Sequence, residues 1–193
     1  MSDGPYQSLP LRKPWREAAE FAHKEAFSSD ERSDAICAAM HNDLKEDVGL
    51  DRLKAIGSIL LQDEQGSLFA DQADSELDAI RDQYAPSSLM DAIIEHAQYC
   101  IRSGLSGDQA LEAAINRASL DNAHANARSI EEHYLRDGAG MKGSEVRSNL
   151  NEALSSSRAQ NIGREVIALM KGENVETKVR KATGIDEGLT IEP

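Results

Sequence analysis

Apolar residues recur at helical spacing along most of this chain. Before Gly104, for example, Leu89, Ile93, Ala97 and Ile101 share one helical face, and the glycine follows as a C-terminal cap. No segment shows the sustained alternation of a strand, and no Asn-Gly or Asp-Gly turn links two β-branched runs. The pattern predicts an all-α fold: an irregular helical bundle of seven to nine helices with an extended N-terminal arm. Because only 4% of the residues are aromatic, we expect a core of Leu, Ile, Val and Ala.

The chain divides into three predicted parts. Residues 1–14 contain three prolines and form an extended N-terminal arm, 15–170 form the helical domain, and 171–193 form a weakly structured C-terminal segment. Helical patterns are predicted over 15–27, 28–49, 50–66, around 76–84, 87–104, from Ser106 or Asp108 through 136, 143–160 and 161–182.

The arm SLPLRKPW has two interpretations. Leu9 and Leu11 can pack onto the bundle while Trp15 anchors the first helix, which is the interpretation we favour. Alternatively, the proline-rich segment binds a groove or a nucleic acid.

The net charge of −13 is concentrated in one block. Residues 28–82 hold fourteen acidic and five basic residues, a net of −9. Such a block repels phosphate backbones, so we expect no nucleic-acid partner and favour a basic protein surface. A solubilising role is the simpler alternative, and an acidic DNA mimic is a third hypothesis.

The segment RASLDNAHANARSIEEHYLR, residues 117–136, carries the residues best suited to chemistry. Six residues separate Arg117 from His124, and four separate Arg128 from His133. This spacing on a helix resembles that of the HEPN domains, a class of all-α ribonucleases that act on RNA at a dimer interface. The resemblance implies that a histidine moves the 2′-hydroxyl proton while an arginine stabilises the charged phosphorane.

The same segment also has a structural interpretation. Arg117, Asp121, His124 and Arg128 form a ladder of charged residues along one solvated face. The opposite face carries a stripe whose 3-4-3-4 spacing suits packing against a partner helix, and we expect that partner to be a second copy of the chain. The members of this stripe are Leu120, Ala123, Ala127, Ile130 and Tyr134.

An upstream stripe is offset from this one by about 140°. It consists of Leu111, Ala114, Ile115 and Ala118. Either the helix breaks near 119–122, or its two halves pack against different elements.

Motifs for cofactors and metals are weak. Glu20 and Asp121 each precede a histidine, His23 and His124, by three residues, as in di-metal bundles, but exposed helical histidines explain these pairs more simply. There is no phosphate-binding glycine loop, GxSxG elbow or HExxH, so we expect no cofactor and no metal.

The cysteines and the lengths of the apolar runs indicate the compartment in which the protein acts. Cys37 and Cys100 lie in apolar helical patterns, which suggests buried free thiols in a reducing compartment. With no apolar run long enough to span a membrane, we expect a cytoplasmic protein.

The sequence therefore favours a small acidic helical protein that acts by protein–protein interaction, as an accessory, inhibitor or antitoxin-like subunit and as a homodimer. Enzymatic activity is the rival hypothesis.

Overall fold

Nine α-helices and no strand make up the part of the chain that the computed structural model describes, which confirms the predicted all-α class and the number of helices. The described residues are 11–23, 29–62, 65–85, 87–136, 138 and 140–172, without the side chains of 20–23 and 29. Most of the predicted N-terminal arm and C-terminal segment lies outside them. The helices are α1 (Lys13–His23), α2 (Ser29–Asp47), α3 (Leu50–Leu60), α4 (Ser67–Gln83), α5 (Ser88–Arg102), α6 (Gly107–Arg136), α7 (Gly140–Leu154), α8 (Ser157–Gln160) and α9 (Ile162–Met170).

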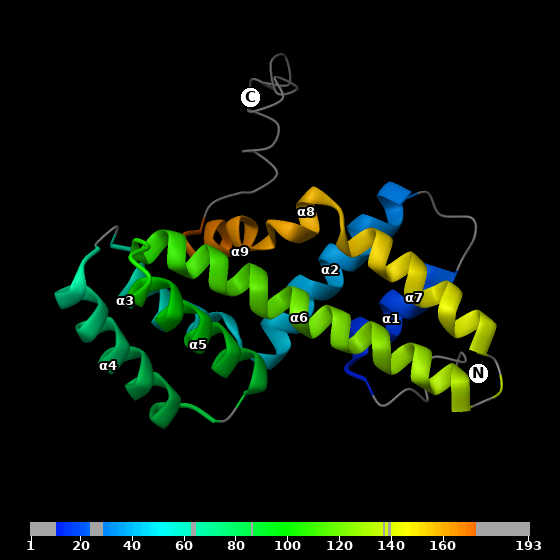
Figure 1. Ribbon diagram of the computed structural model, residues 1–193, viewed down its shortest axis with the longest axis horizontal. Helices are drawn as coiled ribbons and strands as arrows, with labels where there is room; N and C mark the ends of the chain where they lie inside the picture. Colours follow the sequence, from blue (N-terminus) through cyan, green and yellow to red (C-terminus); the bar gives the residue numbers. More distant parts are fainter. Residues whose placement is uncertain are drawn as a thin grey trace, which may run out of the picture.

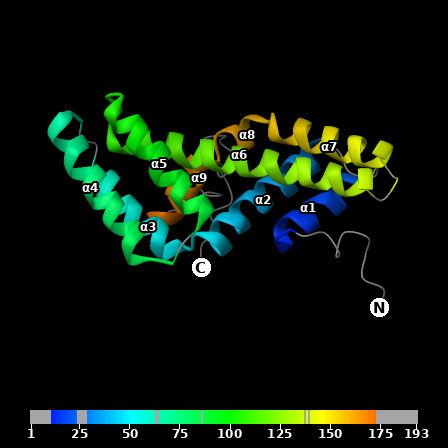
Figure 2. The same cartoon turned by 60° about the horizontal axis from the view of Figure 1, so that its bottom comes forward.

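Helix α6 runs along the length of the molecule, and the other helices are arranged around it (Figure 1). Helices α3, α4 and α5 lie toward its N-terminal end, whereas α7 and α1 lie toward its C-terminal end, as the turned view also shows (Figure 2). The helix is continuous through 119–122. Of the two possibilities raised by its offset stripes, the structure therefore shows the second: the two halves pack against different elements.

Two glycines allow helices to approach closely. A Cβ atom at Gly107, the first residue of α6, would lie 1.9 Å from the carbonyl oxygen of Leu60 at the end of α3. A Cβ atom at Gly143 of α7 would lie 2.6 Å from the Cβ atom of Tyr134 on α6. Both ends of α6 are thus held against neighbours at distances that admit no side chain.

Helix α4 begins nine residues earlier than the sequence pattern indicated. Its buried positions include Ala70 and Ala73 before Leu77 and Ile80, at helical spacing. Because these two alanines are small and polar residues lie between and after them, the apolar signal is weak where the helix starts.

The buried carboxylate of Asp43 joins three helices. Asp43 is 1% exposed and accepts hydrogen bonds from the guanidinium of Arg12, from Trp15 Nε1 at 2.7 Å and from Asn122 Nδ2 at 2.5 Å. These donors come from the residue before α1, from α1 and from α6. As expected, Leu11 packs against the core and Trp15 is buried, whereas Leu9 lies outside the described residues.

These donors determine the charge state of Asp43. Burial by itself would raise the pKa of this carboxyl, but the hydrogen bonds from Arg12, Trp15 and Asn122 outweigh it and lower the pKa below its ordinary value. Asp47, one turn further along α2, extends the network toward α5. It accepts hydrogen bonds from Ser87 Oγ at 2.9 Å and from Arg12 Nη1 at 3.3 Å.

We predict that Asp43→Asn destabilises the fold by about 3 kcal/mol, because an amide presents its own N–H groups to donors that then remain buried without an acceptor. Urea denaturation at neutral pH measures the difference. Asp71→Asn, on the exposed surface of α4, is the matched control and should change the unfolding free energy by less than about 0.5 kcal/mol. Equal effects of the two substitutions would contradict this role of Asp43.

Candidate functional site

Among the described residues, three surface hollows contain side chains suited to binding or chemistry. The first lies between α6 and α7, the second between α2, α3 and α9, and the third between α1 and α2. Of the residues singled out in the sequence, Asp121, His124 and Arg128 line the first.

The hollow between α6 and α7 has a volume of about 380 Å³ and is lined by polar side chains. Asp121, His124 and Arg128 come from one face of α6, and Arg147 and Asn151 come from α7. Among the described residues, no hydrogen bond or ion pair engages the side chains of His124, Arg128 or Asn151.

Two ion pairs hold the remaining charges of this hollow in place. Asp121 Oδ2 accepts from Arg117 Nε at 3.0 Å, and His96 Nε2 lies 3.9 Å from the same oxygen. Arg147 donates to Glu131 of α6. The negative charge of Asp121 is therefore balanced by Arg117, which does not line the hollow. Glu131 holds the Arg147 guanidinium at a defined position.

The predicted Arg–His pairs are only partly brought together. His124 and Arg128 share the hollow, and Arg117 reaches it only through its ion pair with Asp121. His133 does not line the hollow; its ring packs edge-to-face against Tyr134, with the ring centroids 6.0 Å apart. The grouping that the fold creates therefore combines one residue from each predicted pair with Arg147 and Asn151, which no pattern in the sequence indicated.

The predicted interface stripe lies inside the chain. Ala123, Ala127 and Ile130 are buried, and Leu120 and Tyr134 are partly buried against the core. Helix α7 packs on this part of α6, so the partner helix that the spacing calls for belongs to the same chain. A second copy of the folded chain would not reach these buried side chains.

A second cluster joins α2 to the C-terminal helices. His41 Nε2 lies 2.6 Å from Glu165 Oε2, and Arg158 Nε donates to Glu165 Oε1 at 2.9 Å. Arg158 also donates to Asp34 Oδ1 at 2.8 Å. The hydrogen bond with His41 is the largest cause of the low pKa of Glu165, about 2, and it outweighs the opposing effect of burial.

His41, Arg158 and Glu165 border a groove of about 440 Å³ between α2, α3 and α9. Its apolar lining consists of four leucines and Val166, and of these leucines Leu50 is 41% exposed and Leu169 is 50% exposed. The sequence did not reveal this groove, because 124 positions separate His41 from Glu165.

Neither cysteine is placed as a nucleophile. Both are free thiols; Cys37 is buried as expected, whereas Cys100 is partly exposed. Burial raises the pKa of Cys37 to about 11, and it also raises the pKa of Cys100. Both side chains are therefore thiols and not thiolates at neutral pH.

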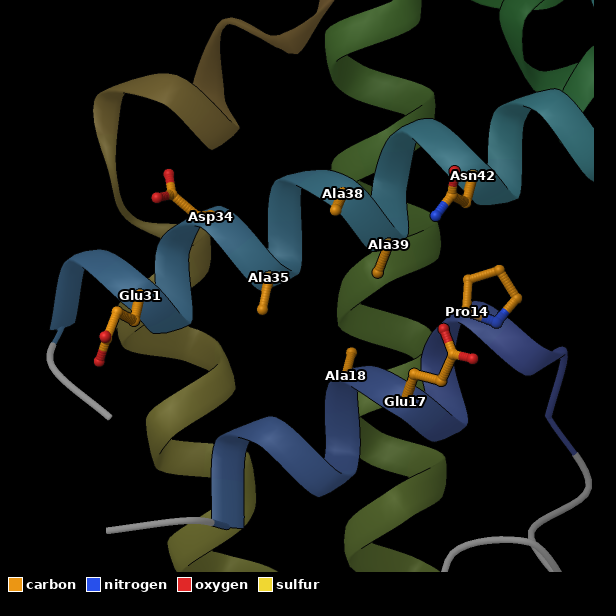
Figure 3. A pocket seen from close by; sticks show the side chains of 9 residues that line it. All are labelled: Pro14, Glu17, Ala18, Glu31, Asp34, Ala35, Ala38, Ala39 and Asn42. Carbon is orange, nitrogen blue, oxygen red and sulfur yellow. The ribbon is translucent and has the colours of Figure 1, made fainter. Parts of the chain in front are cut away.

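The third hollow, of about 460 Å³, lies between α1 and α2 (Figure 3). Its floor consists of Ala18, Ala35, Ala38 and Ala39. The remaining lining residues are Pro14, Asn42 and three acids, Glu17, Glu31 and Asp34. Figure 3 shows Glu17 at one end of the alanine surface and Glu31 at the other, while the carboxylate of Asp34 points away from α1.

The described residues contain neither a cluster of metal-ligating side chains nor a membrane-spanning helix. Within them, no group of three or more His, Cys, Asp and Glu side chains is arranged to hold a metal ion. The side chains of Glu20 and His23 lie outside this set. None of the helices described is long and apolar enough to cross a bilayer.

Comparison with known proteins yields no similarity on which to base a function: no family model, curated protein or solved structure matches the chain significantly.

We predict that Glu165 contributes stability that acid removes. Since its pKa in the folded chain lies below the ordinary value near 4.3, this contribution is complete above that value and disappears as the pH falls toward about 2. Urea denaturation of the wild type and of Glu165→Gln between pH 7 and pH 3 should show a difference that shrinks with acidification.

Glu145→Gln, on the exposed surface of α7, supplies the control for this experiment. Its unfolding free energy should differ from that of the wild type by a small amount that stays the same at each pH. A pH-independent effect of Glu165→Gln would contradict the prediction.

Proposed function

We propose that this protein binds a partner protein, and that the α1–α2 groove receives a basic helical segment of that partner. The observation that carries the proposal is the composition of the groove: an alanine floor with the carboxylates of Glu17 and Glu31 at its two ends, and no basic residue among the described side chains that line it. Small side chains on the floor let a helix approach closely, and the carboxylates select lysine or arginine on the incoming face.

The charge of α2 supports the same proposal. This helix contains six acidic and two basic residues, and together with α3 and α4 it belongs to the acidic block. Two acidic residues of the groove lining form ion pairs that are exposed to solvent. Glu17 pairs with Lys13 at 3.7 Å, and Asp34 pairs with Arg158. Exposed ion pairs contribute little stability, about 0–1 kcal/mol each, so cations of a partner can replace or join them at small cost.

An enzymatic role and a DNA-mimic role receive less support. A mimic requires an ordered row of surface carboxylates, whereas the described carboxylates of 28–82 belong to three helices and include the buried Asp43. The ribonuclease hypothesis requires both members of one predicted Arg–His pair at one site, whereas the hollow is lined by His124 without Arg117 and by Arg128 without His133.

We expect an alanine- and lysine-based helical peptide to shift the backbone amide NMR signals of α1 and α2 and to leave those of α6 and α7 unchanged. A peptide with glutamate in place of lysine should produce no shifts, and raising the salt concentration should weaken the effect of the lysine peptide. Binding of both peptides, or shifts located away from α1 and α2, would contradict the proposal.

Ala38→Arg tests the same site by substitution. Ala38 is exposed on the groove floor, so an arginine there leaves the core intact but places a positive charge where the lysines would bind. Affinity for the lysine peptide should fall about tenfold or more. Ala125→Arg, at an exposed alanine of α6, makes the same change outside the groove and should leave affinity unchanged.

A further inference from the structure

The hollow between α6 and α7 concentrates positive charge in a chain whose net charge is −13. Two guanidinium groups, those of Arg128 and Arg147, line it together with the imidazole of His124 and the amide of Asn151. The other charged lining residue is Asp121, which already pairs with Arg117. An anion entering the hollow would therefore meet a carboxylate whose charge is balanced.

We infer that this hollow binds a small phosphorylated ligand through its phosphate group. Guanidinium groups match phosphate oxygens with paired N–H donors, and the amide N–H groups of Asn151 and a ring N–H of His124 are donors of the kind that complete such a site. These contacts do not depend on the partner-binding role proposed for the α1–α2 groove.

Arg147 and Arg128 would contribute to phosphate binding in different ways. Arg147 is fixed by Glu131, so it needs little further ordering when a ligand binds. Arg128 is exposed, and within the described residues it has no carboxylate partner. The positive charge that remains after the two ion pairs are counted is therefore that of Arg128, and it is the charge available to neutralise a phosphate.

Size and electrostatics favour a small ligand over a nucleic acid. A volume of about 380 Å³ lies in the range of small-molecule sites. The acidic block of 28–82 would repel a chain of phosphates that extends beyond the hollow. A single phosphate experiences mainly the charges within a Debye length, about 8 Å at physiological ionic strength.

Amide NMR titrations of the whole protein with inorganic phosphate and with a nucleoside 5′-monophosphate test the inference. Shifts at 121–128 and 147–151 are expected. A response to both ligands would show that the phosphate group suffices, and a response to the nucleotide alone would show that the ligand's organic part also contributes. No saturable shift with either ligand at millimolar concentration would overturn the inference.

Substitution distinguishes the hollow from general charge attraction. Arg128→Gln should weaken binding about tenfold, the loss expected for hydrogen bonds to a charged group, and Asn151→Ala should weaken it less. Arg136→Gln removes the same charge from an exposed position at the end of α6 and should leave affinity unchanged. Equal losses from Arg128→Gln and Arg136→Gln would overturn the assignment of the site.

A short single-stranded RNA provides the remaining comparison. Saturable binding of this RNA without binding of the small phosphates would overturn the inference and identify a nucleic-acid surface instead. Circular dichroism of each variant, compared with the wild type, establishes that a loss of binding does not reflect loss of the fold.

Discussion

The carboxylate of Asp43 is the contact on which the relative placement of α1, α2 and α6 depends. It is fully buried, so its charge is tolerated only while Arg12, Trp15 and Asn122 donate to it together. Those donors come from segments far apart in sequence, and each must occupy its position for the carboxylate to be satisfied. The fold therefore gains specificity as well as stability from one charged group, and the α1–α2 groove exists in its present shape because Trp15 holds α1 to this point.

The offset between the two stripes of α6 explains the extended arrangement of the bundle. A straight helix with one apolar stripe would collect its neighbours on one side. In α6 the stripe moves around the helix between Ala118 and Ala123, so the first half packs against a different group of helices from the second. The second half lies against α7, and its charged face borders the side of α7 that carries Arg147 and Asn151. The polar hollow is a consequence of that register shift.

The sequence predicted the helices far better than the functional sites, because apolar spacing is a local pattern whereas a site combines residues from different helices. Periodicity reports which face of a helix is covered, so the burial of Ala123, Ala127 and Ile130 was foreseeable. It does not report which chain supplies the cover, and a second copy was expected where α7 packs. Similarly, His124 and Arg128 were recognisable as neighbours on one helix. Arg147 joins them only because α7 folds back along α6, and no local pattern contains that information.

The two proposed binding sites carry opposite charges, and neither needs to change when a ligand binds at the other. Asn122 donates to Asp43 from the residue next to Asp121, so the core network of the α1–α2 region and the edge of the phosphate hollow meet on a single turn of α6. The acidic residues near the groove would repel a phosphate, and the arginines of the hollow would repel a basic helix. Each surface thus rejects the other's ligand.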